Sequence, residues 1–182
     1  MRFLCLITIL AFSLAVDAQP GNPAFDWGYT YGGAGNSDRF YLEADTQGNV
    51  IVCGRFKGTV DFDPGPGTAT LSTKFNYSEI YIAKFDSSGN FIWVRHLSGN
   101  SYPVYIQGMN VDSRGAILIL SESQPGIDLD PGPGSHIIST HSVTFILKLN
   151  AQGNFVWAKE FGHQSFFQPH CSTVDKDDAI YA

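Results

Sequence analysis

The chain has 182 residues, and its 11 basic and 17 acidic side chains give a formal net charge of −6. This acidity argues against a nucleic-acid-binding protein, because affinity for nucleic acid rests on Lys and Arg side chains that neutralise phosphate. It also disfavours binding to anionic membranes, and it is compatible with binding divalent cations. Three cysteines are too few for a small scaffold held together by disulfides.

The first eighteen residues have the pattern of a secretory signal peptide. A basic start at Arg2 is followed by an apolar run at residues 3–15 and by small residues ending at Ala18. The apolar run is shorter than the roughly 20 residues that a membrane-spanning helix needs. We therefore predict a signal peptide at residues 1–18, a mature chain without membrane insertion, and a secreted, extracellular or cell-surface location.

The remaining sequence repeats itself at intervals of about 64 to 67 residues. Asp-Phe-Asp-Pro-Gly-Pro-Gly at residues 61–67 returns as Asp-Leu-Asp-Pro-Gly-Pro-Gly at residues 128–134. Gly-Asn-Phe-Ile-Trp at residues 89–93 returns as Gly-Asn-Phe-Val-Trp at residues 153–157. A fixed period of this length is typical of small supersecondary units that bury their faces against one another.

Four-residue turns separate the apolar runs. Each has Asp or Asn first and Gly fourth, at residues 45–48, 86–89, 112–115 and 150–153. Asp and Asn side chains hydrogen-bond the backbone that follows them, and Gly accepts a positive φ, so these turns predict hairpins. A fifth copy ends at Asp178 in place of Gly, and Asp is among the residues that tolerate this conformation.

Runs of strand length lie between the turns and are dominated by Val, Ile, Tyr, Phe and Trp. In the first unit they are residues 25–31, 39–44, 49–55 and 79–85, and in the second they are residues 91–97, 105–111, 116–121 and 143–149. Several runs are apolar on both faces, which predicts a sheet stacked between two others. One Trp recurs in each unit, at Trp27, Trp93 and Trp157, and we expect these side chains to pack between units.

Four antiparallel strands per unit, stacked face to face, are the blades of a β-propeller. We therefore predict an all-β fold, an incomplete β-propeller of four-stranded antiparallel blades, each with an inserted hairpin that turns on Pro-Gly-Pro-Gly. Blade 1 covers about residues 25–90, blade 2 about 91–154, and a truncated blade 3 about 155–182. Because the last apolar run stops short, we expect the chain to be a fragment, the front part of a longer protein.

These linked motifs resemble the SBBP-type β-propeller repeat of secreted bacterial proteins. The motifs are Gly-Asn-Phe-x-Trp, the Asp-x-x-Gly-Asn-Val-x-Val-x-Gly-x-Phe-x-Gly at residues 45–58, the Asp-Phe-Asp-Pro-Gly-Pro-Gly, and Ile-Ala-Lys-Phe-Asp at residues 82–86. The resemblance implies a propeller, export, and in many members a C-terminal sorting domain, but no single enzymatic activity. The chain departs from the pattern at residues 98–104 and 163–170, where the Gly-Gly of residues 32–33 is missing.

The inserted hairpins supply the candidate metal ligands Asp61 and Asp63, with Asp128 and Asp130 in the second unit. Two residues apart on a strand, the carboxylates of each pair share one face, and Ca²⁺ prefers several oxygen ligands of this kind. The alternative is structural, because an Asp before a Pro-Gly turn can accept hydrogen bonds from the backbone of the turn. Apart from Ca²⁺, the sequence predicts no cofactor.

No familiar catalytic motif is present, including His-Glu-x-x-His, Gly-x-Ser-x-Gly and a phosphate-binding Gly loop. His163, His170 and Cys171 do not have the spacing of a zinc site. Cys53 lies in an apolar run, which favours a buried thiol. A disulfide between Cys53 and Cys171 is the alternative that the sequence leaves open.

The leading function hypothesis is a secreted or cell-surface β-propeller scaffold that binds a glycan or a surface protein, without catalysis in this segment. The alternative is the N-terminal part of a secreted glycan-processing hydrolase or lyase whose active site lies in further blades. Besides a glycan or surface protein, the expected partners are missing C-terminal blades and a sorting domain of the same protein.

Overall fold

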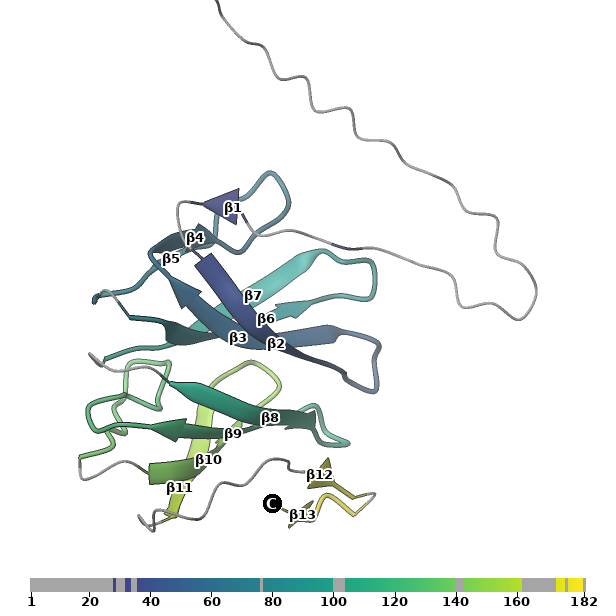
Figure 1. The fold of residues 1–182 in the computed structure, drawn as a ribbon. Helices are drawn as coiled ribbons and strands as arrows, with labels where there is room; N and C mark the ends of the chain where they lie inside the picture. The colour runs from purple at the N-terminus through teal and green to yellow at the C-terminus, as the bar shows by residue number, and fades with distance from the viewer. Residues whose placement is uncertain are drawn as a thin grey trace, which may run out of the picture.

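The structure is a computed structural model, and it describes residues 28, 32–33, 36–75, 77–99, 104–139, 143–161, 173–175 and 177–181. Within these residues the fold is all-β and contains no helix (Figure 1). The expected signal peptide at residues 1–18 lies outside the described residues, as do all but one of residues 25–31.

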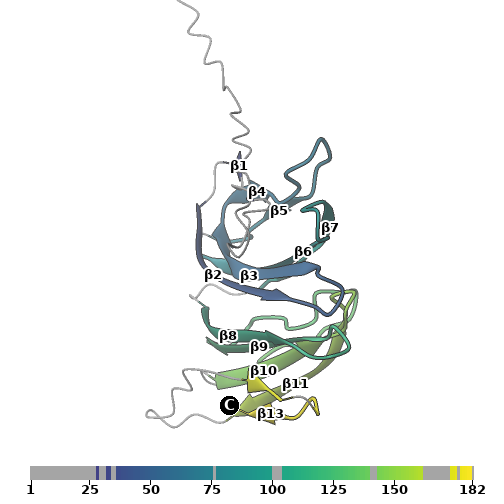
Figure 2. The same cartoon turned by 90° about the vertical axis from the view of Figure 1, so that its right-hand side faces the viewer.

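Two four-stranded antiparallel sheets form the body of the fold, as the repeat predicted, and they stack one on the other (Figures 1 and 2). The first sheet has the order β2-β3-β6-β7, with β2 at Asn36–Ala44, β3 at Val50–Lys57, β6 at Glu79–Phe85 and β7 at Phe91–Leu97. The second has the order β8-β9-β10-β11, with β8 at Tyr105–Val111, β9 at Ile117–Ser123, β10 at Val143–Leu149 and β11 at Phe155–Phe161.

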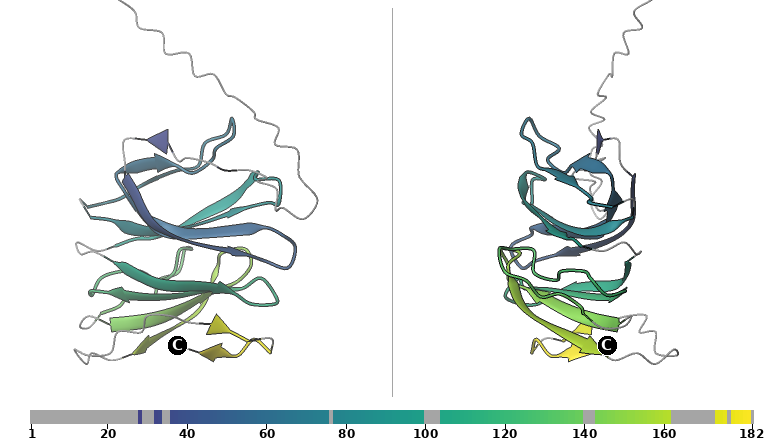
Figure 3. Two further views of the ribbon diagram at one scale, coloured as in Figure 1. Left: turned by 45° about the vertical axis from the view of Figure 1, so that its right-hand side comes forward. Right: turned by 90° about the vertical axis from the view of Figure 1, so that its left-hand side faces the viewer.

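Two smaller sheets lie at the ends of this stack (Figure 3). One has the order β1-β4-β5, with β1 at Gly32–Gly33, β4 at Thr59–Asp61 and β5 at Thr70–Ser72. The other is the hairpin of β12 at Thr173–Val174 and β13 at Ile180–Tyr181. The β4–β5 hairpin is the insertion that the sequence predicted.

The grouping of strands into units differs from the sequence interpretation. The run at residues 91–97 was assigned to the start of the second unit, but it forms β7 and pairs with β6 in the first sheet. In the same way β11 pairs with β10 and closes the second sheet. The reason is local, because the short turns at residues 86–89 and 150–153 make adjacent antiparallel partners of the runs on either side. Each sheet therefore begins one strand later than its sequence unit.

The repeated turns have the predicted conformation. Their fourth residues have positive φ, and Asp178 shares this conformation with a φ of 61°. The Asp45 carboxylate accepts hydrogen bonds from the backbone N–H groups of Gln47, at 2.9 Å, and Asn49, at 3.0 Å. Asp86, Asp112, Asn150 and Asp175 accept the corresponding bonds in the other four turns.

The apolar core is continuous between the two large sheets. Ile51 and Ile82 of the first sheet face the second sheet, where Ile119 and Leu147 belong to the same buried cluster. On the far face of the second sheet, the buried side chains of Leu118, Leu120 and Ile146 pack against Val174 and Ile180 of the β12–β13 hairpin. The prediction that these strands are covered on both sides is confirmed.

The inserted hairpins occupy equivalent places in the two units. In the first unit Phe62 packs on Phe56 and Tyr81, with ring centroids 5.4 Å and 4.4 Å away, and so covers the outer face of the first sheet. In the second unit the equivalent Leu129 enters the core between the sheets, with Ile127 and Ile138. Each insertion thus covers the same face of its own sheet.

Trp93 packs between the sheets, as expected, and supports a turn of the second unit. A Cβ at Gly153 would lie 3.0 Å from the Trp93 ring and 2.8 Å from Arg95 Cγ. The Arg95 guanidinium lies over the Trp93 ring and donates a hydrogen bond to the Gln152 carbonyl at 2.8 Å. Trp157 packs against the cluster of Leu118, Leu120 and Ile146 on the far face of the second sheet. Trp27 lies outside the described residues.

The close approach at Gly153 predicts a difference between two turn substitutions. Gly153→Ala and Gly89→Ala both place a Cβ at positive φ, at a cost of about 1 kcal/mol each. Gly153→Ala must also displace Trp93 or Arg95, so we expect it to lose about 1–3 kcal/mol more. Urea unfolding of both variants measures the difference, and equal losses would contradict the packing of this turn between the sheets.

Candidate functional site

The first pair of predicted metal ligands caps its own hairpin. Asp61 Oδ1 accepts hydrogen bonds from the backbone N–H groups of Asp63, at 3.1 Å, and Ala69, at 2.8 Å. Asp63 Oδ1 accepts a hydrogen bond from the Gly65 N–H at 2.8 Å. These bonds fix the Pro-Gly-Pro-Gly turn, which is the structural role that the sequence left open.

The second pair repeats this arrangement. Asp128 Oδ1 accepts from the N–H groups of Asp130, at 3.0 Å, and His136, at 2.8 Å, and Asp130 Oδ1 accepts from Gly132 N–H at 2.8 Å. Burial acts to raise the pKa of Asp128, but the hydrogen bonds from His136 and Asp130 outweigh it, and the pKa is lowered. The ionised carboxylate is therefore the form that the hairpin stabilises.

Each pair is bound within its own hairpin, and the structure does not combine them into one set of ligands. In the part of the chain that the structure describes, no three His, Cys, Asp or Glu side chains are grouped so as to hold a metal ion. Calcium binding by these four residues stays a prediction. Cys53 is a buried free thiol whose pKa is raised by burial, and Cys171 lies outside the described residues.

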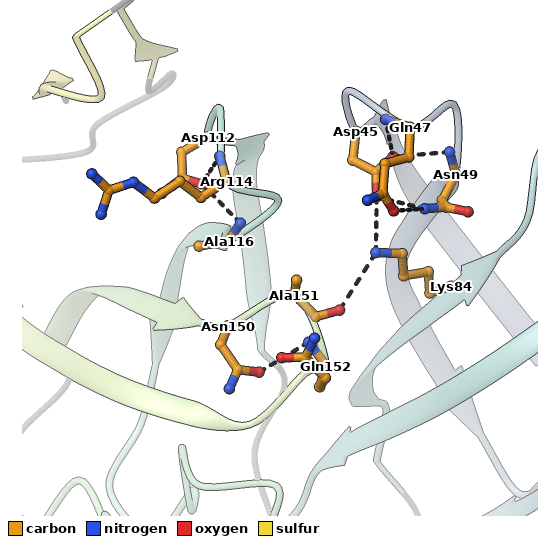
Figure 4. Close-up of polar contacts among 10 residues, drawn as sticks. All are labelled: Asp45, Gln47, Asn49, Lys84, Asp112, Arg114, Ala116, Asn150, Ala151 and Gln152. Carbon is orange, nitrogen blue, oxygen red and sulfur yellow. Dashed lines mark hydrogen bonds and ion pairs between the residues drawn. The ribbon is translucent and has the colours of Figure 1, made fainter.

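A polar cleft of about 380 Å³ lies where turns of the two large sheets meet. We call this place the first seam, formed by the turns at residues 45–48, 112–115 and 150–153 (Figure 4). Its polar side chains are hydroxyls, amides, cations and one carboxylate, from Asp45, Thr46, Gln47, Lys84, Ser113, Arg114 and Gln152. Sequence reasoning did not single out this cleft, because residues more than 100 positions apart line it.

Lys84 lies at the first seam and connects the two sheets. Its Nζ is 2.8 Å from Asp45 Oδ2 and donates a longer hydrogen bond, at 3.4 Å, to the Ala151 carbonyl (Figure 4). The exposed fractions of the two charged side chains are only 8% for Lys84 and 4% for Asp45. A buried charge of this kind is tolerated only when it is paired and hydrogen-bonded.

The second unit contains the same ion pair. Lys148 Nζ lies 2.8 Å from Asp112 Oδ2. The signal for both pairs is present in the sequence, since Lys84 and Lys148 are 64 residues apart and Asp45 and Asp112 are 67 apart. This recurrence shows that the Lys and the Asp occupy equivalent positions in the two units. Their contact is seen only in the structure.

One polar pair in the first sheet has no repeated counterpart. Glu79 of β6 is buried and forms a close ion pair with His96 of β7, beside the Phe56 ring. Among the residues that the structure describes, one carboxylate oxygen of Glu79 has no hydrogen-bond partner. The second unit has Val143 and Glu160 at the corresponding places, so this pair belongs to the first unit alone.

Comparison of the chain with protein-family models, with curated proteins and with solved structures found no match. A search for helices long and apolar enough to cross a membrane found none in the described ranges.

The pairing of Asp45 predicts a specific loss of stability in acid. Burial acts to raise the pKa of Asp45, but hydrogen bonds from Lys84, Asn49 and Gln47 outweigh it and lower the pKa from 3.8 to about 2. The ionised form is therefore favoured by folding, and its contribution is present above pH 4 and lost as the pH falls towards 2.

Urea unfolding of the wild type and of Asp45→Asn between pH 5 and pH 2 tests the sign and the size of the contribution that the Asp45 charge makes to stability. We expect the wild type to be more stable at pH 7, and the difference to shrink by about 2 kcal/mol between pH 5 and pH 2. A difference that does not change with pH would show that the Asp45 charge contributes nothing to folding.

Proposed function

We propose that the two large sheets are consecutive blades of a β-propeller. The contact between their first strands, β2 and β8, supports this, since it is the most extensive contact between the two sheets. The Tyr41 hydroxyl donates to the Ile106 carbonyl at 3.1 Å, and Arg55 donates to the Val104 carbonyl at 3.0 Å. Sheets that converge along their first strands form a wedge, and wedges of this kind surround the central channel of a propeller.

The propeller would act as a secreted or cell-surface scaffold of the SBBP type that binds a glycan or a surface protein and carries out no catalysis in this segment. One observation carries this proposal: the recurring polar side chains maintain the fold. The repeated Asp and Asn residues cap turns, and the repeated Lys residues pair with turn Asp residues.

Support for the scaffold role also comes from the position of the sequence motifs. The Asp-x-x-Gly turns and the Ile-Ala-Lys-Phe-Asp run meet at the first seam, and the Pro-Gly-Pro-Gly hairpins cover one face of each sheet. A propeller closes its ring only with more blades than two. Further repeats of the same kind are therefore the partners that we propose for these sheets.

A binding array tests the scaffold proposal against the enzyme alternative. The mature chain, labelled and free of its signal peptide, is applied to immobilised glycans and to surface-protein extracts, and the glycans are analysed afterwards for cleavage. We expect retention on at least one glycan or protein class and no cleavage. Retention on neither surface, or cleavage of a bound glycan, would contradict a non-catalytic binding scaffold.

A further inference from the structure

A second seam in the protein indicates which chemical group the first seam can hold. Here the turn at residues 112–115 meets the turn that ends at Asp178. The Asp178 carboxylate accepts two hydrogen bonds from Ser113, from the backbone N–H at 2.9 Å and from the hydroxyl at 2.8 Å. These bonds lower the pKa of Asp178, and the nearby charges of Arg114 and Lys148 add to the effect. The second seam is thus a carboxylate site filled by the chain itself.

The first seam has the same donors and no carboxylate in that place. Thr46 corresponds to Ser113, Lys84 to Lys148, and Gly115 to Asp178. Within the described residues, neither the N–H nor the hydroxyl of Thr46 has a hydrogen-bond partner. The cleft of about 380 Å³ lies beside these free donors and is lined by Gly115, which has no side chain to fill it.

Lys84 provides the positive charge that an anionic group would meet at the first seam. Lys84 has a third N–H beyond the two that Asp45 and Ala151 receive. Arg114 lines the same cleft, but its guanidinium points away from Lys84 and Asp45 (Figure 4). Asp45 is the carboxylate of the lining, and Lys84 neutralises it, just as Lys148 neutralises Asp112 beside the filled second seam. The charge of Arg114 acts on Asp178 and so belongs to the second seam.

The rest of the lining favours a sugar as the carrier of the carboxylate. Gln47 and Gln152 provide exposed amides, Thr46 and Ser113 provide hydroxyls, and the apolar lining is limited to Ala151 and Gly115. Amide and hydroxyl groups match the hydroxyls of a sugar ring. A volume of about 380 Å³ falls within the range of small-molecule sites, roughly 300–1,000 Å³.

We propose that the first seam binds the carboxylate of a uronic-acid residue in a glycan, on the Thr46 N–H and hydroxyl and beside Lys84. This inference rests on the proposed function, because it names the ligand class of the binding scaffold. The carboxylate takes the position that the Asp178 side chain has at the second seam. The sugar hydroxyls face the amides of Gln47 and Gln152.

The structure supplies a variant that should close the site without unfolding the protein. In Gly115→Asp the new side chain has the conformation that Asp178 already adopts, and a Cβ at Gly115 meets Ala151 Cβ at an ordinary distance of 3.4 Å. We expect the new carboxylate to accept the hydrogen bonds of Thr46 and exclude the ligand. Gly89→Asp is the matched control, with the same charge at the same turn position outside the cleft. Thr46→Val removes the hydroxyl donor of the site, and Thr68→Val removes an exposed hydroxyl elsewhere.

Calorimetric titration with digalacturonate, with its neutral methyl ester and with a triglutamate peptide tests the inference. We expect the mature chain to bind digalacturonate at least about tenfold more tightly than the ester, because charge-assisted hydrogen bonds are lost in the ester. Gly115→Asp and Thr46→Val should weaken digalacturonate binding by about tenfold and fivefold or more, and both controls should bind like the wild type. Cooperative melting of Gly115→Asp near the wild-type temperature shows that the variant is folded.

Equal binding of acid and ester, or undiminished binding by folded Gly115→Asp, would overturn the inference. Preferred binding of triglutamate that Gly115→Asp abolishes would also overturn it, by making the ligand an acidic peptide. Retention of neutral glycans on the array without digalacturonate binding would refute the uronate site and leave the scaffold function standing. A chain that binds nothing in either experiment would refute both.

Discussion

The fold depends on burial of both faces of every four-stranded sheet. β3, β6, β9 and β10 carry large apolar side chains on each side, so a sheet with one face in water would expose much of its core. In the first sheet, the second sheet covers one face and the inserted hairpin covers the other. In the second sheet, the inserted hairpin joins the core between the sheets, and the β12–β13 hairpin packs on the far face. The turns, the Lys–Asp pairs and Trp93 all act at the edges of this stacking. These contacts between the sheets form only because the buried apolar faces hold the sheets together.

This constraint separates what the sequence could predict from what it could not. Turn conformations, burial on both faces and the inserted hairpins follow from residues close together in the chain, and the structure confirms them. The strand grouping was wrong because the repeat period alone does not fix where a sheet begins, whereas the turn at residues 86–89 does. Asp61, Asp63, Asp128 and Asp130 were correctly recognised as possible turn caps, but whether they also bind calcium depends on loops that the hairpins alone do not specify.

Contacts between units were beyond the reach of sequence reasoning. Lys84 and Ala151 are 67 residues apart, and Ser113 and Asp178 are 65 apart. Each pair meets only because two sheets stack with their turns in register. Asp178 illustrates the difference: the sequence identified an Asp that tolerates positive φ, and the structure adds that its carboxylate binds the neighbouring turn. One substitution at a repeated position thus decides whether a seam is filled or open.

Residues at the seams can differ from unit to unit without changing the fold. The buried strands keep their apolar character because they are covered on both faces, while turn residues at the seams vary without cost to the core. Thr46, Gln47, Arg114 and Gln152 are of this second kind, since they are exposed and point away from the apolar stack. Differences among seams can therefore give each one its own ligand preference on a common scaffold.

Hydrogen exchange of backbone amides tests the mutual dependence of the two sheets most directly. If each sheet needs the other, the slowest amides of β3 and β6 and those of β9 and β10 should open with one common free energy and the same denaturant dependence. Two distinct opening free energies, with one sheet exchanging fully while the other stays protected, would contradict the account.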